Sequence, residues 1–144
     1  MKKILSILCG IILITCSLLS FGNSILAASS SGQGIVTVGK NSVMFQAERG
    51  LSRSTAYSYV SVKAESVYPV GTYSNDNYKY CKTQIYHNTI GNTPISKKVQ
   101  LMEGSDYKNV TISEGYLDQT LFDLCFSGNS PYYGAVIVYD YKGN

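Results

Sequence analysis

Few residues in this sequence have the types and the spacing that catalysis needs. His87 is the only histidine, and it follows Cys81 by six positions. If both residues lie on one strand they share a face but are about 20 Å apart, which is too far for a cysteine–histidine pair. No nucleophile-elbow pattern surrounds a serine, so no motif supports a Ser–His–Asp arrangement. We therefore expect His87 to be an ordinary surface residue in a loop after a strand.

Metal ligands and paired carboxylates are equally sparse. A zinc site would need His87 together with two cysteines, and no closely spaced ligand pair begins such a site. The densest acidic group is Glu114, Asp118 and Asp123. Paired carboxylates can hydrolyse a glycoside, but acids of this kind are usually solvated. We expect no metal, no cofactor and no enzyme activity, with a small secreted hydrolase as the third functional hypothesis.

The cysteines predict a cross-link instead of a catalytic site. Cys9 and Cys16 lie in an apolar N-terminal segment, whereas Cys81 and Cys125 lie in the body of the chain. An even number of cysteines in a small exported protein is typical of a disulfide. Closing a loop of about 45 residues would stabilise the fold by roughly 4 kcal/mol on the chain-entropy account. We predict a Cys81–Cys125 disulfide, with two free buried thiols as the alternative.

The N-terminus has the pattern of a secretion signal. A basic start precedes an uncharged run over residues 4–21, and small residues follow at Ala27 and Ala28. This order predicts a signal peptide over residues 1–28 and a secreted, extracellular protein. The alternatives are a lipid anchor at Cys16 and an uncleaved signal that stays in the membrane. Nothing after residue 28 is apolar enough to span a membrane.

The rest of the chain is nearly neutral. The whole sequence has 12 Lys and Arg and 9 Asp and Glu, and two of the lysines, Lys2 and Lys3, lie in the signal. The net charge of the remainder is therefore 12 − 2 − 9 = +1. This balance gives no electrostatic basis for binding nucleic acid or acidic lipid. We expect an extracellular partner, either a glycan or a cell-surface protein.

Strand-forming residues dominate the body of the chain, which includes all 13 tyrosines. After a flexible Ser/Gly-rich leader at 29–34, residues 35–144 predict one all-β domain. We expect a small antiparallel two-sheet sandwich of about 7–8 strands, with a small β-barrel as the alternative. The expected strands are 35–38, 43–46, 56–67, 78–86, 99–102, 110–113, 121–126 and 135–141. The first two would form a hairpin, and a helical turn is expected within 116–122.

Side-chain alternation assigns several tyrosines to solvent-facing sides of two strands, where they share a face with charged residues. These tyrosines are Tyr57, Tyr59, Tyr78, Tyr80 and Tyr86. On the second of these strands, Cys81 points inward. We predict that the tyrosines are partly exposed on one sheet face and contact the ligand. The alternatives are that they only pack against cross-strand neighbours, or that the buried and exposed faces are inverted.

Taken together, these features favour a secreted, disulfide-stabilised β-sandwich that acts as a non-catalytic binding module. Its ligand would be a glycan or another cell-surface component. The alternative is a secreted effector, such as a bacteriocin or a toxin-like protein. The sequence contains no motif that decides between these two hypotheses. A killing assay with purified protein separates them, because only an effector would kill or inhibit cells.

Overall fold

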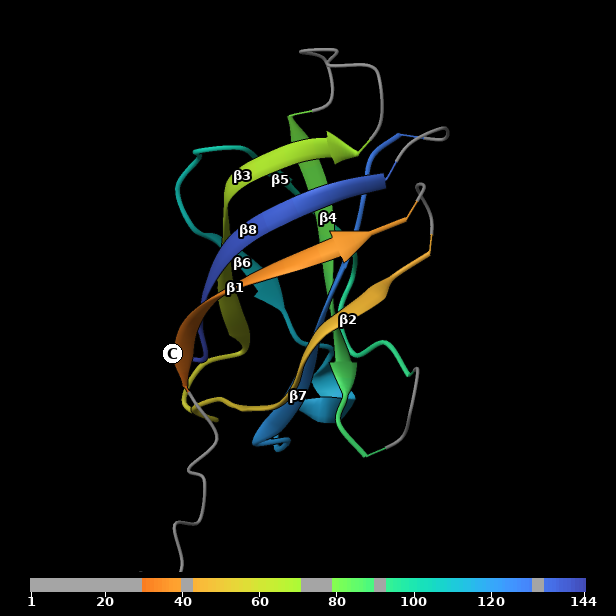
Figure 1. The fold of residues 1–144 in the computed structure, drawn as a ribbon. Helices are drawn as coiled ribbons and strands as arrows, with labels where there is room; N and C mark the ends of the chain where they lie inside the picture. The colour runs from red at the N-terminus through yellow and green to blue at the C-terminus, as the bar shows by residue number, and fades with distance from the viewer. Residues whose placement is uncertain (1–29, 40–42, 71–78, 90–92, 131–133) are drawn as a thin grey trace, which may run out of the picture.

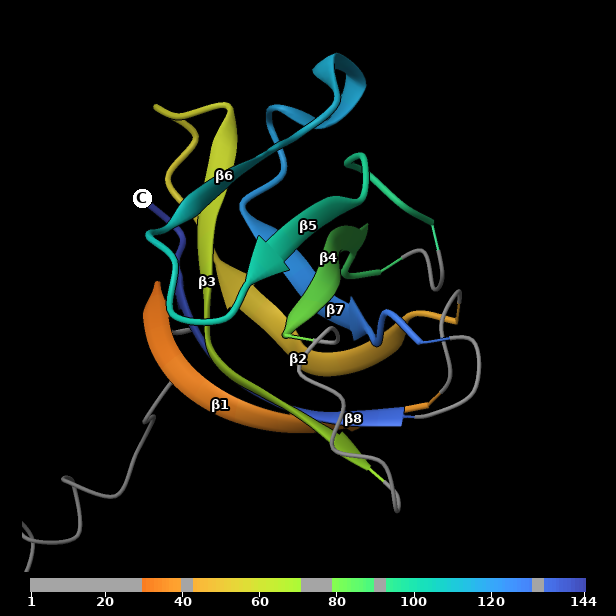
Figure 2. The same cartoon turned by 90° about the horizontal axis from the view of Figure 1, so that it is seen from above.

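The computed structural model describes residues 30–39, 43–70, 79–89, 93–130 and 134–144, which form two packed antiparallel sheets (Figure 1). Sheet 1 has the spatial order β1 (Ser31–Val38), β8 (Gly134–Lys142), β3 (Tyr59–Val70) and β6 (Lys108–Thr111). Sheet 2 has the order β2 (Phe45–Ser52), β7 (Leu121–Ser127), β4 (Tyr80–His87) and β5 (Val99–Met102). Seen from above, β1 and β8 curve along one side of the molecule, and β4, β5 and β7 lie on the other (Figure 2). The predicted β-sandwich is confirmed, and the described strands do not close into a barrel.

The Ser/Gly-rich stretch that was expected to be a flexible leader is largely the first half of β1. Gly32 pairs with Tyr141 of β8, and Gly34 pairs with Tyr139. A Cβ atom on Gly32 would lie 2.8 Å from the Tyr141 hydroxyl oxygen, and one on Gly34 would collide with the Tyr139 hydroxyl. The glycines therefore make room for two buried tyrosine rings, which composition alone does not reveal. The predicted signal peptide at 1–28 lies outside the described residues.

The expected hairpin between the first two strands is also wrong. β1 pairs with β8 in sheet 1, whereas β2 pairs with β7 in sheet 2. The two strands bury Val38 and Leu51 against the same core from opposite layers, and a hairpin would place both in one layer. The helical turn is displaced as well: a 3₁₀ helix, η3, spans Glu114–Tyr116, and Leu121 already begins β7.

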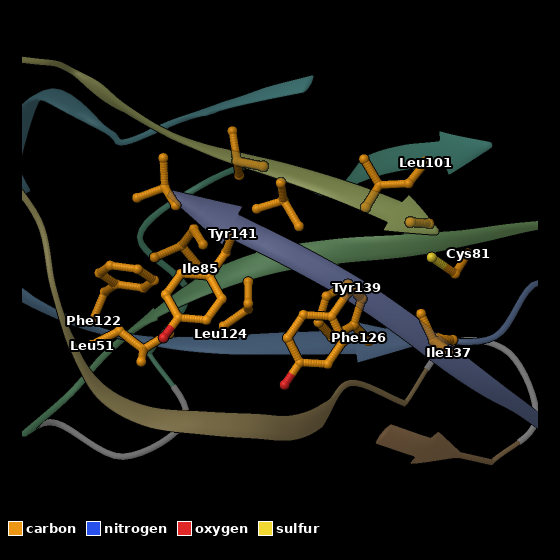
Figure 3. Packing of buried hydrophobic residues seen from close by; sticks show 14 of the residues in the cluster. Leu51, Cys81, Ile85, Leu101, Phe122, Leu124, Phe126, Ile137, Tyr139 and Tyr141 are labelled. Carbon is orange, nitrogen blue, oxygen red and sulfur yellow. The ribbon is translucent and has the colours of Figure 1, made fainter. Parts of the chain in front are cut away.

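Alternate residues of the central strands meet between the sheets and form one hydrophobic core. Its fully buried members include Val60, Val62, Ile85, Phe122, Leu124, Phe126, Ile137 and Tyr139. The Tyr139 ring packs against Phe126, with ring centroids 4.5 Å apart (Figure 3). Its hydroxyl donates a hydrogen bond of 3.0 Å to Oε1 of Glu48 on β2. Tyr139 thus joins the two sheets through both its ring and its hydroxyl.

A β-bulge at Glu65 reverses which face of β3 is buried. Ala64 and Ser66 pair with consecutive residues of β8, so Glu65 between them is an extra residue. After the bulge, the odd-numbered Val67 is buried at 3% exposure, and Tyr68 is 57% exposed. The alternation expected along this strand therefore holds only as far as Ala64.

The predicted disulfide is wrong, because Cys81 and Cys125 are both free thiols, and both are buried. Cys125 on β7 pairs with Gln84 on β4, three positions along β4 from Cys81. That offset separates the cysteines by about 10 Å, beyond the reach of a disulfide. Their side chains also belong to different faces of sheet 2: Cys81 is part of the core cluster (Figure 3), as predicted, and Cys125, whose register partner is Gln84, is not.

Candidate functional site

The structure separates the tyrosines that the alternation pattern grouped together. Tyr59 belongs to β3 of sheet 1, whereas Tyr80 and Tyr86 belong to β4 of sheet 2. Tyr57 lies just before β3, and Tyr78 lies outside the described residues. The prediction of one tyrosine face is therefore wrong. Alternation shows which side of a strand faces solvent, but not which sheet the strand joins.

Tyr57 and Tyr59 form an aromatic pair at the start of β3. Their ring centroids are 5.6 Å apart and their planes meet at 60°, an edge-to-face arrangement. Tyr57 is 47% exposed and Tyr59 is half-buried. Tyr59 pairs with Thr111 of the edge strand β6, so the aromatic pair lies beside that edge of sheet 1.

A buried arginine fixes the loop that carries Tyr57. Nη1 of Arg53 donates hydrogen bonds to the carbonyl oxygens of Ser54 and Tyr57, at 3.0 and 2.5 Å. Nη2 donates to the carbonyl oxygen of Leu117 at 2.6 Å. Burial lowers the pKa of Arg53 from its ordinary value, an effect that the charge of Asp118 opposes. Because arginine stays charged at physiological pH, this restraint on the Tyr57 loop does not depend on pH.

A hollow opens next to the aromatic pair, along the seam between the edge strands β5 and β6. The chain segments there run antiparallel, and the backbone N–H of Ser113 donates a 2.8 Å hydrogen bond to the carbonyl oxygen of Ile95. Ser96 forms a bridge with Ile112, and Nζ of Lys108 donates a 3.0 Å hydrogen bond to the carbonyl oxygen of Gln100. Between these points the edges part and leave a hollow of ≈ 480 Å³. Its lining residues are Lys97, Lys98, Val99, Asn109, Thr111, Ile112 and Ser113.

We call this hollow together with Tyr57 and Tyr59 the seam site. The hollow is lined by two lysines, an amide and two hydroxyls, together with apolar surface that includes a valine and an isoleucine. Oδ1 of Asn109 accepts a 3.0 Å hydrogen bond from Oγ of Ser61, which orients the amide. Pockets for small ligands have volumes of roughly 300–1,000 Å³ and a few convergent polar groups. The described lining contains no carboxylate, histidine or thiol.

Tyr80 and Tyr86 belong to a different and more constrained surface. Oη of Tyr86 donates to Oε1 of Gln84 at 3.3 Å, and Nε2 of Gln84 donates to the carbonyl oxygen of Ser96 at 2.8 Å. Burial raises the pKa of the Tyr86 hydroxyl. Tyr80 pairs with Met102 of β5. These two tyrosines pack against their neighbours, which was the alternative interpretation of the sequence.

His87 is the last residue of β4 and is buried, contrary to the expectation of an exposed loop residue. Its Nδ1 accepts a hydrogen bond of 3.1 Å from the backbone N–H of Thr89. Its ring meets Tyr116 edge-on, with centroids 5.9 Å apart. Strand residues at odd positions here point inward, so the burial of His87 follows from the alternation that places Cys81 in the core.

The three acidic residues that the sequence grouped have different surroundings. Glu114 and Asp118 are exposed, whereas Asp123 is buried on β7. The Asp123 carboxylate accepts hydrogen bonds from Nε2 of Gln46, the backbone N–H of Gly50 and Nδ2 of Asn88, at 3.0, 3.0 and 2.8 Å. These bonds hold the irregular part of β2, where the register to β7 shifts twice. Asp123 thus has a structural role.

Across the described ranges, no three His, Cys, Asp or Glu side chains gather closely enough to hold a metal ion. None of the helices in the described part of the chain has the length and apolarity needed to cross a membrane.

The outer face of sheet 1 has a charged half and an apolar half. Nζ of Lys63 and Oε1 of Glu65 form an ion pair of 2.7 Å, and burial together with a hydrogen bond to Glu65 raises the pKa of Asp140. Farther along the same face, Ile35 is 71% exposed and Tyr68 is 57% exposed. Tyr68 follows the strand expected at 56–67, and the bulge moves it to this face.

Sequence reasoning also missed the lining of the hollow. Lys97, Asn109 and Thr111 come from two short strands and their flanks, and no local pattern indicates that these edges part. The Ser96–Ile112 bridge and the Lys108–Gln100 hydrogen bond define the hollow, and both are contacts between segments that are not adjacent in sequence. Comparison of the chain with protein-family models, curated proteins and solved structures gives no match. The class that the fold defines is a small antiparallel β-sandwich of two four-stranded sheets.

Proposed function

We propose that this protein is a secreted, non-catalytic binding module that holds a glycan at the seam site. The observation that carries the proposal is the Tyr57–Tyr59 pair, with Tyr57 exposed, next to β6 and a hollow of ≈ 480 Å³ that has hydroxyl, amide and ammonium groups in its lining. Tyr59 and Thr111 are cross-strand partners, and Thr111 lines the hollow, so Tyr59 is the neighbour of a lining residue.

A carbohydrate fits both parts of this surface. A sugar ring has an apolar C–H face, which can stack on a tyrosine, and a rim of hydroxyls that need hydrogen-bond partners. The hollow supplies such partners from Asn109, Thr111 and Ser113. Lys97 and Lys98 extend the choice to glycans that carry carboxylate or phosphate groups, because ammonium groups bind such anions.

The test is a titration of the purified protein with soluble polysaccharides and cell-wall fractions. We expect at least one of them to bind, and we expect Tyr57→Ala and Tyr59→Ala to weaken that binding by at least about tenfold. Tyr68→Ala is the matched control, because Tyr68 is a similarly exposed tyrosine at the other end of β3. Binding to none of the fractions, or equal weakening by all three substitutions, would overturn the proposal.

Secretion is the second part of the proposal, and the order of basic, apolar and small residues over 1–28 supports it. N-terminal sequencing of exported protein tests it. We expect the mature chain to begin within a residue or two of Ser29. A first residue at Cys16, or a chain that still begins at Met1 in the membrane fraction, would contradict secretion in this form.

A further inference from the structure

A sandwich of two open sheets has four edge strands, and each is a place where another chain can add a strand. Here they are β1 and β6 in sheet 1, and β2 and β5 in sheet 2. Three of the four have features that discourage pairing. β5 and β6 have only four residues each. β2 has two register shifts and carries Glu48 and Arg49.

β1 has none of these features. It is eight residues long, its sequence SGQGIVTV contains no charge and no proline, and its register to β8 is unbroken. Five of its residues are exposed: Ser31, Gly32, Gln33, Ile35 and Thr37. Figure 1 shows β1 at the border of sheet 1 with β8 beside it, and no strand among the described residues pairs with its other edge. A long, regular, uncharged edge is the kind that natural sheets usually protect.

We propose that β1 is a self-association edge, which pairs in antiparallel fashion with β1 of a second copy of this chain around a two-fold axis near Ile35. The two copies of sheet 1 then join into one continuous sheet. In this register Ile35 lies opposite Ile35 of the second copy, and Gln33 lies opposite Thr37. The pairing covers the large apolar side chain with the highest exposure in the described part of the molecule, at 71%.

A second copy fits this edge better than a charged partner does. The outward side chains Gln33, Ile35 and Thr37 offer no charge for such a partner to recognise, and in a two-fold pair they bring no like charges together. Val138 of β8 is the neighbour of Ile35 on the same face, so the apolar contact continues on both sides of the axis. Because each copy offers one edge of this kind among its described strands, the association closes at two copies and does not grow into a fibre.

The test is the molecular mass of the purified protein in solution, measured by analytical ultracentrifugation over a range of micromolar concentrations. We expect a reversible monomer–dimer equilibrium. Ile35→Lys and Thr37→Lys change exposed side chains, so both variants should fold, which circular dichroism and the unfolding midpoint check. Each should raise the dimer dissociation constant at least about tenfold. In Ile35→Lys the two introduced lysines would lie opposite each other, and in Thr37→Lys each lysine would enter an interface without a counter-charge.

Tyr68→Lys is the matched control. It adds the same charge to the same outer face, but two strands away from β1, and we expect it to dimerise like the original protein. A monomer at every concentration would overturn the proposal, as would dimers that persist in Ile35→Lys. Loss of the dimer in Tyr68→Lys as well would place the interface at the centre of the face and not at the edge. None of these outcomes depends on glycan binding at the seam site.

Discussion

At the residue scale, the two cysteines that were predicted to form a disulfide are separate, buried thiols. Burial raises the pKa of Cys81 to about 12, and burial together with the nearby Asp123 raises that of Cys125 to about 12. Both thiols therefore stay protonated and unreactive in the folded protein. An alkylating reagent should label neither cysteine in the native protein at neutral pH. After unfolding without a reductant, the reagent should label both Cys81 and Cys125, as mass spectrometry would show. If neither of these two cysteines is labelled in the unfolded protein, they form a disulfide.

The same thiols make stability depend on pH in the alkaline range. An unfolded cysteine has a pKa of about 8.5, so the unfolded chain loses protons there while the folded chain keeps them. The contribution of the two buried thiols to the free energy of unfolding is therefore fully present below about pH 8.5 and is lost as the pH rises above it. We expect the free energy of unfolding to fall by about 1 kcal/mol per thiol between pH 8.5 and 9.5.

Urea unfolding at a series of pH values measures this slope. Cys125→Ser is the control, because it removes one of the two titrating thiols and should halve the loss. A free energy of unfolding that stays constant from pH 8 to pH 10 would contradict the assignment of two buried thiols.

The glycines of β1 give a second test at this scale. A Cβ atom on Gly34 would collide with the buried Tyr139 hydroxyl, which is bonded to Glu48. Gly34→Ala should therefore lower the free energy of unfolding by about 1–3 kcal/mol. Gly115→Ala is the control, because nothing lies within 4 Å of a Cβ there, and its effect should be close to zero. Equal effects in urea unfolding would mean that β1 does not pack on Tyr139.

At the element scale, the bulge in β3 decides which side chains reach solvent. Alternation along the sequence identifies the buried positions before Glu65, but the position of a bulge depends on the register with β8 and has no local signature. The first half of β1 also lacks a local signature, because its Ser/Gly-rich composition is typical of a linker. It forms a strand because its glycines make room for buried tyrosine rings of β8. Local patterns thus located seven strands closely. The expected strand 43–46 overlaps β2 at only two residues, and the pairing partners could not be predicted.

Substitutions at two neighbouring residues of β3, one on its buried face and one on its exposed face, test the bulge. Val67→Ala should lower the free energy of unfolding by about 1–3 kcal/mol, because it removes methyl groups from the core. Tyr68→Ala should change it by less than about 1 kcal/mol, although it removes a larger side chain, because Tyr68 is exposed. Chemical unfolding of both variants decides the matter, and a larger loss from Tyr68→Ala would show that the strand has no bulge at Glu65.

At the scale of the whole molecule, the seam site exists only because two sheets meet. Its residues come from the loop before β3, the approach to β5, and β6 with its flank, which are distant in sequence. The sequence indicated Tyr57 and Tyr59 as contacts, and the structure pairs Tyr59 with Thr111, a residue that lines the hollow. It also indicated Tyr80 and Tyr86, which lie on the other sheet, because a strand pattern carries no information about layers.

The central claim is that ligands bind along this seam. The most direct measurement is a two-dimensional amide NMR titration of the protein with the polysaccharide fraction that binds it most tightly. We expect the largest shift changes at residues 57–59, 97–99 and 109–113, with the amides of β1 and of Tyr80 and Tyr86 unchanged at constant protein concentration. Changes centred on the outer face of sheet 2 or around Tyr68, or no changes with any fraction, would contradict the account.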